Sequence, residues 1–264
     1  MRSGDAVLGT FIKLPVLEAI DLVADSDLDF AVVDLEHSQL GDAAGSALVR
    51  HGSALGLPVV VRLPTVEASL INRLLEAGAA GIQTSSLRLA SSVTDLVAAT
   101  RYAPGGHRSL STAQPSAGYG SRSLREYLDG EANDPPLLIG QIETATTDDP
   151  LAEIIRGGLD VVFLGTTDLS ADLGAPGALD DPRVVERMKE VARAAADSRT
   201  SLGGFAANSA SYAALGALGS TYTVISSDVQ ALKEGLGALA RAGNDLPARS
   251  AGGSQATGAR RRDR

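Results

Sequence analysis

The sequence predicts a (β/α)8 barrel of the TIM type, an α/β fold in which eight parallel strands are each followed by a helix. The chain has 264 residues, close to the roughly 250 of a single barrel of this kind. Its apolar residues, 44% of the chain, are mainly aliphatic, with only 3% aromatic residues, and Val, Ile and Leu dominate barrel interiors. Short apolar segments also alternate with segments of helical periodicity, which indicates a parallel sheet covered by helices.

A recurrent junction supports this alternation. In it a helical segment ends at a small or acidic turn and passes directly into a short apolar, partly β-branched run. Glu76–Ala80 precedes Gly81–Gln83 in this way, and Arg156–Asp160 precedes Val161–Leu164. Glycine just past a helix supplies a left-handed cap, and a continuous apolar run suits a strand buried on both faces. Two further junctions precede Phe30–Val33 and Thr221–Ile225.

Taken in order, the elements form eight strand and helix pairs. The expected strands are Leu8–Leu14, Phe30–Asp34, Val59–Arg62, Gly81–Gln83, Leu137–Ile142, Val161–Leu164, Leu202–Phe205 and Thr221–Ser226. The expected helices are Val16–Val23, Ala43–Leu55, Glu67–Ala77, Ala90–Tyr102, Leu151–Arg156, Arg183–Ser198, Ser209–Leu215 and Asp228–Arg241. Strict alternation favours a closed barrel, with a doubly wound open sheet as the alternative.

One connection is much longer than the others. Ala103–Pro136 contains Pro and Gly turns, a Ser/Gly-rich run and a short helical piece, Leu124–Leu128. A connection of this length in a compact fold is usually functional or disordered. We therefore expect an oligomer contact, a lid or a disordered loop.

Composition and charge exclude several classes of function. The chain contains no Cys, which excludes disulfides, thiolate metal sites and cysteine nucleophiles and leads us to expect a cytoplasmic protein. No segment resembles a signal peptide or the ~20 apolar residues of a membrane span, so we expect no membrane association. The net charge is -9, and the residues before Ala248 carry -13. A body that acidic would repel nucleic acid.

The C-terminal segment differs from the rest in composition. From Ala248 onwards it contains five Arg and one Asp, and its Gly, Ser and Arg content is typical of a disordered tail. We therefore expect one barrel domain over residues 1–243 and a tail over residues 244–264.

Polar residues gather at the expected C-terminal ends of the strands, where barrel enzymes carry their sites. Because these ends meet at one rim, the side chains are expected to converge on one centre. The candidates are Asp34, Glu36, His37, Arg62, Gln83, Gln141, Glu143, Asp168 and Ser226–Asp228.

Glu143 and Asp168 follow adjacent strands and are candidate ligands of a divalent metal ion. A hard cation such as Mg2+ takes one or two carboxylates and keeps several waters, and Mn2+ or another octahedral metal such as Co2+ also fits. For Asp168 the alternative is a helix N-cap. The segment Gly165–Ser170 also resembles an anion nest, in which backbone N–H groups bind a carboxylate or phosphate.

His37 and Arg62 are the candidate catalytic residues. His37 follows Asp34 and Glu36, whose carboxylates could orient it as a general base, and an ordinary His pKa of roughly 6.5 suits proton transfer. The alternative is a surface loop. Arg62 directly follows an apolar run, so it would reach the barrel mouth as a partner for an oxyanion or carboxylate. An ion pair with a neighbouring strand-end carboxylate is the compatible alternative.

Together these residues resemble the metal-dependent (class II) 2-keto-acid, or pyruvate, aldolases, a family that includes 4-hydroxy-2-oxoheptanedioate aldolase and 2-dehydro-3-deoxyglucarate aldolase. The resemblance runs from about Leu8 to Ala240. Such a resemblance implies a barrel of the phosphoenolpyruvate/pyruvate-binding type. It is carried by Val33–His37, Val59–Arg62, Ala77–Ile82, Arg101–Tyr102, Pro104–Arg108, Gln141–Thr144, Leu164–Gly165 and Asp168–Gly174.

The resemblance also implies roles. Glu143 and Asp168 would bind the metal, Arg62 would stabilise the enolate and aldol oxygens, and His37 with Asp34 would transfer protons. The substrate would be a small 2-keto acid with an aldehyde partner, bound by a homo-oligomer, a hexamer or trimer. Its carboxylate would meet the backbone at Gly165, Thr167 and Asp168, near Gln141, and Ser226 is a further candidate for substrate binding.

The chain departs from the family pattern in several loops. Ala103-Pro104 and Arg108-Ser109 stand where Pro-Pro and Arg-Gly pairs are usual. Thr84-Ser85 stands where a Val-Pro pair usually follows the fourth strand, and Gly165-Thr166 stands where Gly-Pro usually precedes the metal-binding Asp. The predicted function is an aldolase that cleaves or forms a 2-keto-acid aldol through a pyruvate enolate. The alternatives are a metal-dependent decarboxylase of a β-keto acid such as oxaloacetate, a divergent biosynthetic member with another substrate, and a non-catalytic barrel.

Overall fold

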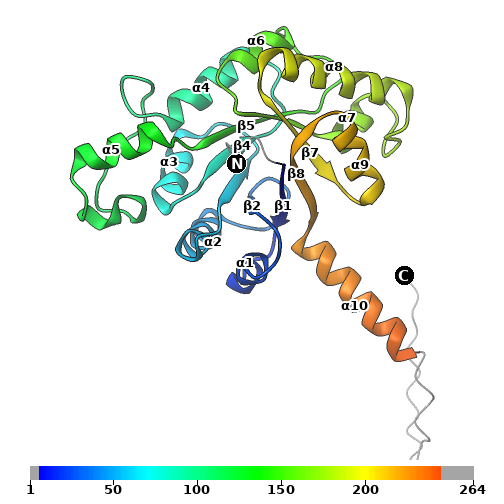
Figure 1. Ribbon diagram of the computed structural model, residues 1–264, viewed down its shortest axis with the longest axis horizontal. Helices are drawn as coiled ribbons and strands as arrows, with labels where there is room; N and C mark the ends of the chain where they lie inside the picture. The colour runs from blue at the N-terminus through cyan, green and yellow to red at the C-terminus, as the bar shows by residue number, and fades with distance from the viewer. Residues whose placement is uncertain (1–5, 245–264) are drawn as a thin grey trace, which may run out of the picture. The chain divides into compact units, whose positions relative to one another are not determined.

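The computed structural model describes residues 6–244 and shows a closed barrel of eight parallel strands in sequence order. The predicted barrel is therefore confirmed, and the open-sheet alternative is excluded because β8 pairs with β1. Figure 1 shows the strands at the centre with the helices outside them. The strands are β1 (Val7–Ile12), β2 (Phe30–Asp34), β3 (Val59–Leu63), β4 (Gly81–Thr84), β5 (Leu137–Ile142), β6 (Val161–Leu164), β7 (Ser201–Ala206) and β8 (Ser220–Ser227).

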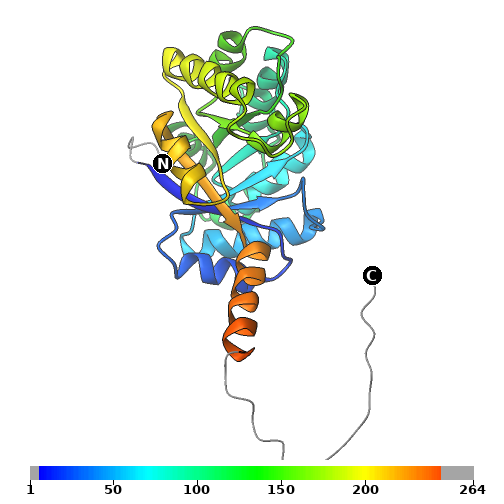
Figure 2. The same ribbon diagram turned by 90° about the vertical axis from the view of Figure 1, so that its right-hand side faces the viewer.

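Six of the helices pack on one another in an outer layer, α1 on α2, α2 on α3, α3 on α4, α4 on α6 and α6 on α8. Figure 2 shows this layer after a quarter turn. Among residues 6–244, none of the helices has the length and apolar character needed to span a bilayer. The helices are α1 (Leu17–Ala24), α2 (Asp42–Leu55), α3 (Ala68–Ala77), α4 (Ala90–Thr100), η1 (Pro115–Gly120), α5 (Leu124–Asn133), α6 (Leu151–Arg156), α7 (Thr166–Asp172), α8 (Pro182–Ser198), α9 (Ser209–Ala217) and α10 (Asp228–Asn244).

The chain divides into two compact units, Met1–Val229 and Gln230–Arg264. The first contains the whole barrel. Within the second, the described residues continue α10, whose Leu232, Leu236 and Leu239 are exposed. The predicted tail lies outside the described residues, apart from Asn244 at the end of α10.

The expected strand ends differ most at β1, which stops at Ile12 and leaves Lys13 and Leu14 in the following loop. The long connection is also more ordered than its sequence indicates. Its helix α5 has ten residues rather than five, and begins at a capping box between Ser123 and Glu126. A Ser followed three residues later by Glu is the sequence signature of such a start.

The barrel interior is more aromatic than the composition suggests. Phe11, Phe30 and Phe163 lie inside it with Tyr222, and the ring of Phe30 stacks on that of Tyr222 with centroids 4.5 Å apart. Gly9 is required beside this stack, because a Cβ there would lie 2.4 Å from the Phe30 ring. These four aromatic rings fill much of the barrel interior, and the ring of Phe11 supports the rim from below, with its centroid 4.2 Å from the Arg62 guanidinium.

Candidate active site

Arg62 and Asp34 form the centre of one half of the rim. They are register partners on β3 and β2, and Arg62 donates from Nε to Asp34 Oδ1 at 2.9 Å and from Nη2 to Oδ2 at 2.7 Å. Asp34 is fully buried. Burial alone would raise the pKa of Asp34, but the hydrogen bonds and charge of Arg62, with a hydrogen bond from Lys13, hold it well below its usual range.

Lys13 is a residue of this half that the sequence analysis missed. Its Nζ lies 2.6 Å from Asp34 Oδ2 and donates to the backbone carbonyl of His37 at 3.0 Å. The following loop is fixed as well, because Asp228 accepts from the backbone N–H groups of Lys13 and Leu14. The available signal was a lone charge inside the apolar run Leu8–Leu14, which marks where β1 ends.

His37 is exposed at the mouth of the barrel. Its Nε2 lies 3.8 Å from Glu36 Oε2, whereas Asp34 accepts from the backbone N–H groups of Glu36 and His37, each at 3.1 Å. Of the two carboxylates that could orient the imidazole, the structure therefore places Glu36 beside it. Asp34 orients the loop that carries His37.

Glu143 forms the centre of the other half. It is 5% exposed, and each carboxylate oxygen accepts one hydrogen bond, Oε1 from Ser86 and Oε2 from Gln141. Burial raises the pKa of Glu143, as do the charges of Asp168 and Glu36, against these two hydrogen bonds. The site therefore holds negative charge that a cation would stabilise.

A chain of buried amides supports Glu143 from within the barrel. Gln83 donates from Nε2 to Gln141 Oε1 at 3.0 Å, and Gln141 donates in turn to Glu143. The direction of both bonds orients each amide, because a carboxylate can only accept here. Gln83 Oε1 is buried without a hydrogen-bond partner among the described residues.

Asp168 lies in the first turn of α7, exposed, and Gly165 occupies the N-cap position. The alternative role of Asp168 as the N-cap is therefore excluded. Gly165 is required by close packing, since a Cβ there would lie 2.5 Å from Glu143 Oε2 and 2.8 Å from Gln141 Nε2.

The three residues expected to contact substrate, Gly165, Thr167 and Ser226, differ in exposure and in whether their backbone groups already have partners. The N–H of Gly165 donates to the carbonyl of Ile142 at 3.1 Å, so this N–H already has a backbone partner. Thr167 is exposed in the first turn of α7, where N–H groups have no partner within the helix. Ser226 is half-buried at the end of β8 with a left-handed φ of 52°.

The rim offers a divalent cation a small set of carboxylates. Over residues 6–244, no cluster of three or more His, Cys, Asp or Glu side chains is arranged to hold a metal ion. A hard cation such as Mg2+ needs only one or two carboxylates, because water and substrate complete its shell. Glu143 and Asp168, coupled closely enough for the charge of one to raise the pKa of the other, fit that requirement.

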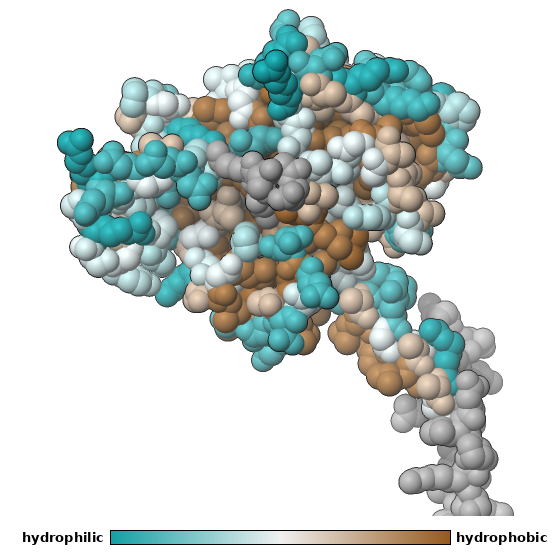
Figure 3. All heavy atoms as spheres, in the orientation of Figure 1, coloured by the Kyte–Doolittle hydropathy of each residue, from teal (hydrophilic) through white to brown (hydrophobic). Residues whose placement is uncertain are grey.

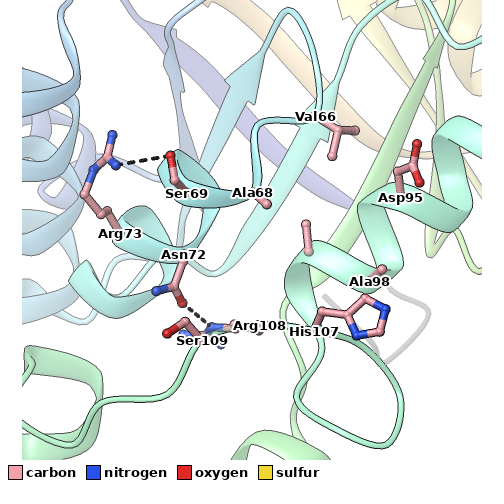
Figure 4. Close-up of a pocket in the computed structure, with 11 residues that line it drawn as sticks. Val66, Ala68, Ser69, Asn72, Arg73, Asp95, Ala98, His107, Arg108 and Ser109 are labelled. Carbon is pink, nitrogen blue, oxygen red and sulfur yellow. Dashed lines mark hydrogen bonds between the residues drawn. The ribbon is translucent and has the colours of Figure 1, made fainter.

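Other candidates lie away from the rim. His51 Nε2 is 2.6 Å from Asp21 Oδ1 and links α2 to α1, as expected for a helix surface. A cavity of about 690 Å³ lies between α3, α4 and residues 107–109 (Figure 4). Arg108 at its wall is held by Glu131 at 2.6 Å and by Asn72 at 3.2 Å. None of the strand-end candidates lines this cavity.

Fold and rim together define the class, a closed (β/α)8 barrel with charged side chains gathered at the C-terminal strand ends, where enzymes of this fold carry their active sites. The family described as HpcH/HpaI aldolase/citrate lyase matches residues 8–234, and the chain belongs to it. This confirms the predicted family and the prediction of a lyase of the aldolase type over the decarboxylase and non-catalytic alternatives.

Similar proteins carry aldolase names. The chain is 33% identical to a hydroxypyruvate/pyruvate aldolase of Roseovarius nubinhibens over 72% of this chain and 74% of that protein. It is 31% identical to a 4-hydroxy-2-oxo-heptane-1,7-dioate aldolase of Salmonella arizonae over 91% of both chains. The crystal structure of an HpcH/HpaI aldolase from Desulfitobacterium hafniense superposes with a TM-score of 0.86 at 28% identity, covering 93% of this chain and 95% of that one.

Proposed function

We propose that this protein is a divalent-metal-dependent aldolase that cleaves or forms the aldol of a small 2-keto acid through the enolate of pyruvate. The observation that carries the proposal is the pairing of two halves at one rim. On one side Glu143 and Asp168 present negative charge to a cation, and on the other Arg62 presents positive charge near the exposed imidazole of His37.

Glu143 and Asp168 would hold Mg2+, Mn2+ or Co2+. When bound, such an ion supplies Lewis acidity that favours enolisation of the keto acid. Gln141 and Ser86 keep the Glu143 carboxylate in place through their hydrogen bonds. The backbone of α7 at Thr167 would receive the substrate carboxylate, and Ser226 would contact the substrate from β8.

The remaining steps of the reaction are carried by His37, which transfers the proton, and by Arg62, which stabilises the developing oxyanion. In the cleavage direction His37 takes the proton of the aldol hydroxyl, the carbon–carbon bond breaks to release an aldehyde, and the resulting enolate takes a proton to give pyruvate. Two of the three Arg62 nitrogens bind Asp34, and the third would donate to the aldol oxygen. Asp34 keeps this guanidinium fixed before substrate binds, which is the preorganisation that oxyanion stabilisation requires.

Hydrogen exchange at pyruvate tests the proposal. The protein is incubated with pyruvate in deuterated water with Mg2+ or Mn2+, and loss of the methyl proton signal is followed by NMR. We expect metal-dependent exchange that Glu143→Ala abolishes. The absence of exchange with any of the divalent metals would overturn the proposal, and exchange retained in Glu143→Ala would overturn the metal assignment.

The substrate within this class is tested separately. Pyruvate and hydroxypyruvate are compared as nucleophiles against a panel of aldehydes, and pyruvate release from oxaloacetate is measured alongside. The relatives named above act on hydroxypyruvate, pyruvate or a heptanedioate aldol by name, and we propose the same range here. Condensation faster than oxaloacetate decarboxylation is the expected result.

We also propose that the protein is a homo-oligomer. Helix α10 exposes Leu232, Leu236 and Leu239, which share one side of a helix at this spacing, and Figure 3 shows apolar side chains exposed along it. Exposed apolar surface of this kind marks contact sites. Light scattering after size exclusion should give a hexamer or trimer, and a monomer would contradict the proposal.

A further inference from the structure

Ser85 and Ser86 follow β4 at the rim, and their hydroxyls contact different carboxylates. Ser86 Oγ donates to Glu143 Oε1 at 2.5 Å. Ser85 Oγ donates to Glu36 Oε2 through a short hydrogen bond. One dipeptide therefore reaches both halves of the proposed active site.

The backbone of Ser86 is held in an unusual conformation. Its φ is 52°, in the left-handed region that favours glycine. The residues on both sides are fixed, because Ser85 N–H donates to the carbonyl of Leu63 at 3.2 Å and Leu87 N–H donates to that of Gln141 at 2.9 Å. Glycine would satisfy this conformation with less strain, so the hydroxyl is what serine adds here.

The Ser86 hydroxyl completes the support of Glu143. Gln141 holds Oε2 and Ser86 holds Oε1, so the plane of the carboxylate is fixed by one donor on each oxygen. Each oxygen can accept a further contact. This is how groups behind a metal-binding carboxylate orient it and strengthen its hold on the cation.

Ser85 acts on the opposite half. It is 5% exposed, and its partner Glu36 lies 3.5 Å from Arg62 Nε and 3.8 Å from His37 Nε2. A fixed hydroxyl donor on Glu36 therefore determines where that carboxylate stands relative to the guanidinium and the imidazole.

We propose that Ser85 and Ser86 are positioning residues with separate tasks. Ser86 orients Glu143 towards a divalent cation, and Ser85 holds Glu36 against Arg62 and His37. The inference rests on the proposed metal-dependent function of the site.

Two measurements separate the tasks. Mn2+ affinity is measured from the EPR signal of free Mn2+, and methyl proton exchange of pyruvate is measured at saturating Mn2+ and over a range of pyruvate concentrations. Ser86→Ala and Ser86→Gly should each weaken Mn2+ binding about tenfold. Ser86→Gly should lower the melting temperature less than Ser86→Ala, because both lose the hydroxyl but only glycine relieves the left-handed backbone. Ser85→Ala should leave Mn2+ affinity within about twofold and lower the maximal exchange rate about tenfold, with little change in KM.

The matched control for Ser86→Gly is Arg199→Gly. Arg199 is an exposed residue at the end of α8 with a φ of 56°, so the substitution relieves a similar backbone far from the rim and should leave Mn2+ binding unchanged. Wild-type Mn2+ affinity in both Ser86 variants, or an unchanged exchange rate in Ser85→Ala, would overturn the corresponding assignment alone. If the wild-type protein neither binds Mn2+ nor exchanges pyruvate protons with any divalent metal, the proposed function is overturned and, with it, this inference.

Discussion

Arg62 and Asp34 meet through two parallel hydrogen bonds inside the barrel mouth, Nε to Oδ1 at 2.9 Å and Nη2 to Oδ2 at 2.7 Å. The carboxylate is fully buried and the Arg62 side chain is 8% exposed. A pair of this kind fixes the guanidinium plane before any ligand arrives. It also makes the site sensitive to loss of either partner, because Arg62 would then keep only Glu36, at 3.5 Å, and Asp34 would keep only Lys13.

Asp34→Asn should therefore affect both stability and activity. The amide leaves Arg62 and Lys13 without their shared counter-charge, and breaking such a buried pair lowers the free energy of unfolding by about 3 kcal/mol. Urea unfolding monitored by circular dichroism measures the loss. Asp42→Asn is the control, since Asp42 pairs with Arg73 at a site where both side chains are at least half exposed, and its effect should stay under about 1 kcal/mol.

The stabilisation by Asp34 should depend on pH in a defined direction. The pKa of Asp34 is lower in the folded protein than its ordinary value, so its contribution is fully present above the unfolded pKa of roughly 3.9 and is lost as pH falls towards the folded pKa. The difference in unfolding free energy between wild type and Asp34→Asn should be constant above about pH 5 and shrink below about pH 4. A gap that widened with acidification would contradict this assignment.

Glu143→Gln should stabilise the metal-free protein while removing its activity. The pKa of Glu143 is raised by burial and by the neighbouring carboxylates, so at neutral pH its charged form is less favourable in the folded than in the unfolded chain. A neutral amide of the same shape removes that penalty. Differential scanning calorimetry in EDTA should give a higher melting temperature for the variant.

Added metal should reverse the order of the two melting temperatures, so that the wild-type protein melts above Glu143→Gln. A cation that binds only the folded state raises the melting temperature of the wild-type protein as its concentration increases, and Glu143→Gln should show a much smaller rise. Equal shifts in both proteins would show that Glu143 is not part of the cation site.

Lys13→Met should lower the activity of the site without abolishing it. The substitution removes one of two cations on Asp34 and the hydrogen bond to the carbonyl of His37. Hydrogen bonds to charged groups contribute about 1.5–3 kcal/mol, so a loss of roughly tenfold or more in kcat is expected. Lys13→Arg keeps the charge and should recover part of it, whereas equal losses in both variants would show that the charge is not what matters.

The strand-end residues could be predicted because barrel geometry sends them all to one rim. Arg62 and Glu143 each follow an apolar run, so their places required only the alternation of strands and helices. The partner of each could not be predicted. Which rim side chains touch depends on the stagger between strands and on rotamers, and a run such as Leu8–Leu14 conceals the end of its strand at Lys13.

The Ser85-Ser86 contacts were hidden for a further reason. The sequence marks Thr84-Ser85 as a departure from the family pattern, which predicts a change at the pocket but not its chemistry. The left-handed φ of Ser86 turns its hydroxyl onto Glu143, and a serine carries no local signal for that conformation. That conformation is imposed by the residues on either side of Ser86, whose backbone N–H groups donate to the carbonyls of Leu63 and Gln141, both distant in sequence.

Gly165→Ala tests how tightly the cation half is packed. The new Cβ would lie 2.5 Å from Glu143 Oε2 and 2.8 Å from Gln141 Nε2. At these distances the carboxylate and the amide must both move away from residue 165. Overpacking of this kind lowers the free energy of unfolding by about 1–3 kcal/mol, and displacement of Glu143 should weaken Mn2+ binding. Gly216→Ala in α9 is the matched control, because nothing lies within 4 Å of its added Cβ and the gain in helix propensity should stabilise the protein by about 0.5–1 kcal/mol. Gly165→Ala with wild-type Mn2+ affinity would mean that Glu143 can shift without consequence, and that the glycine serves the fold rather than the cation.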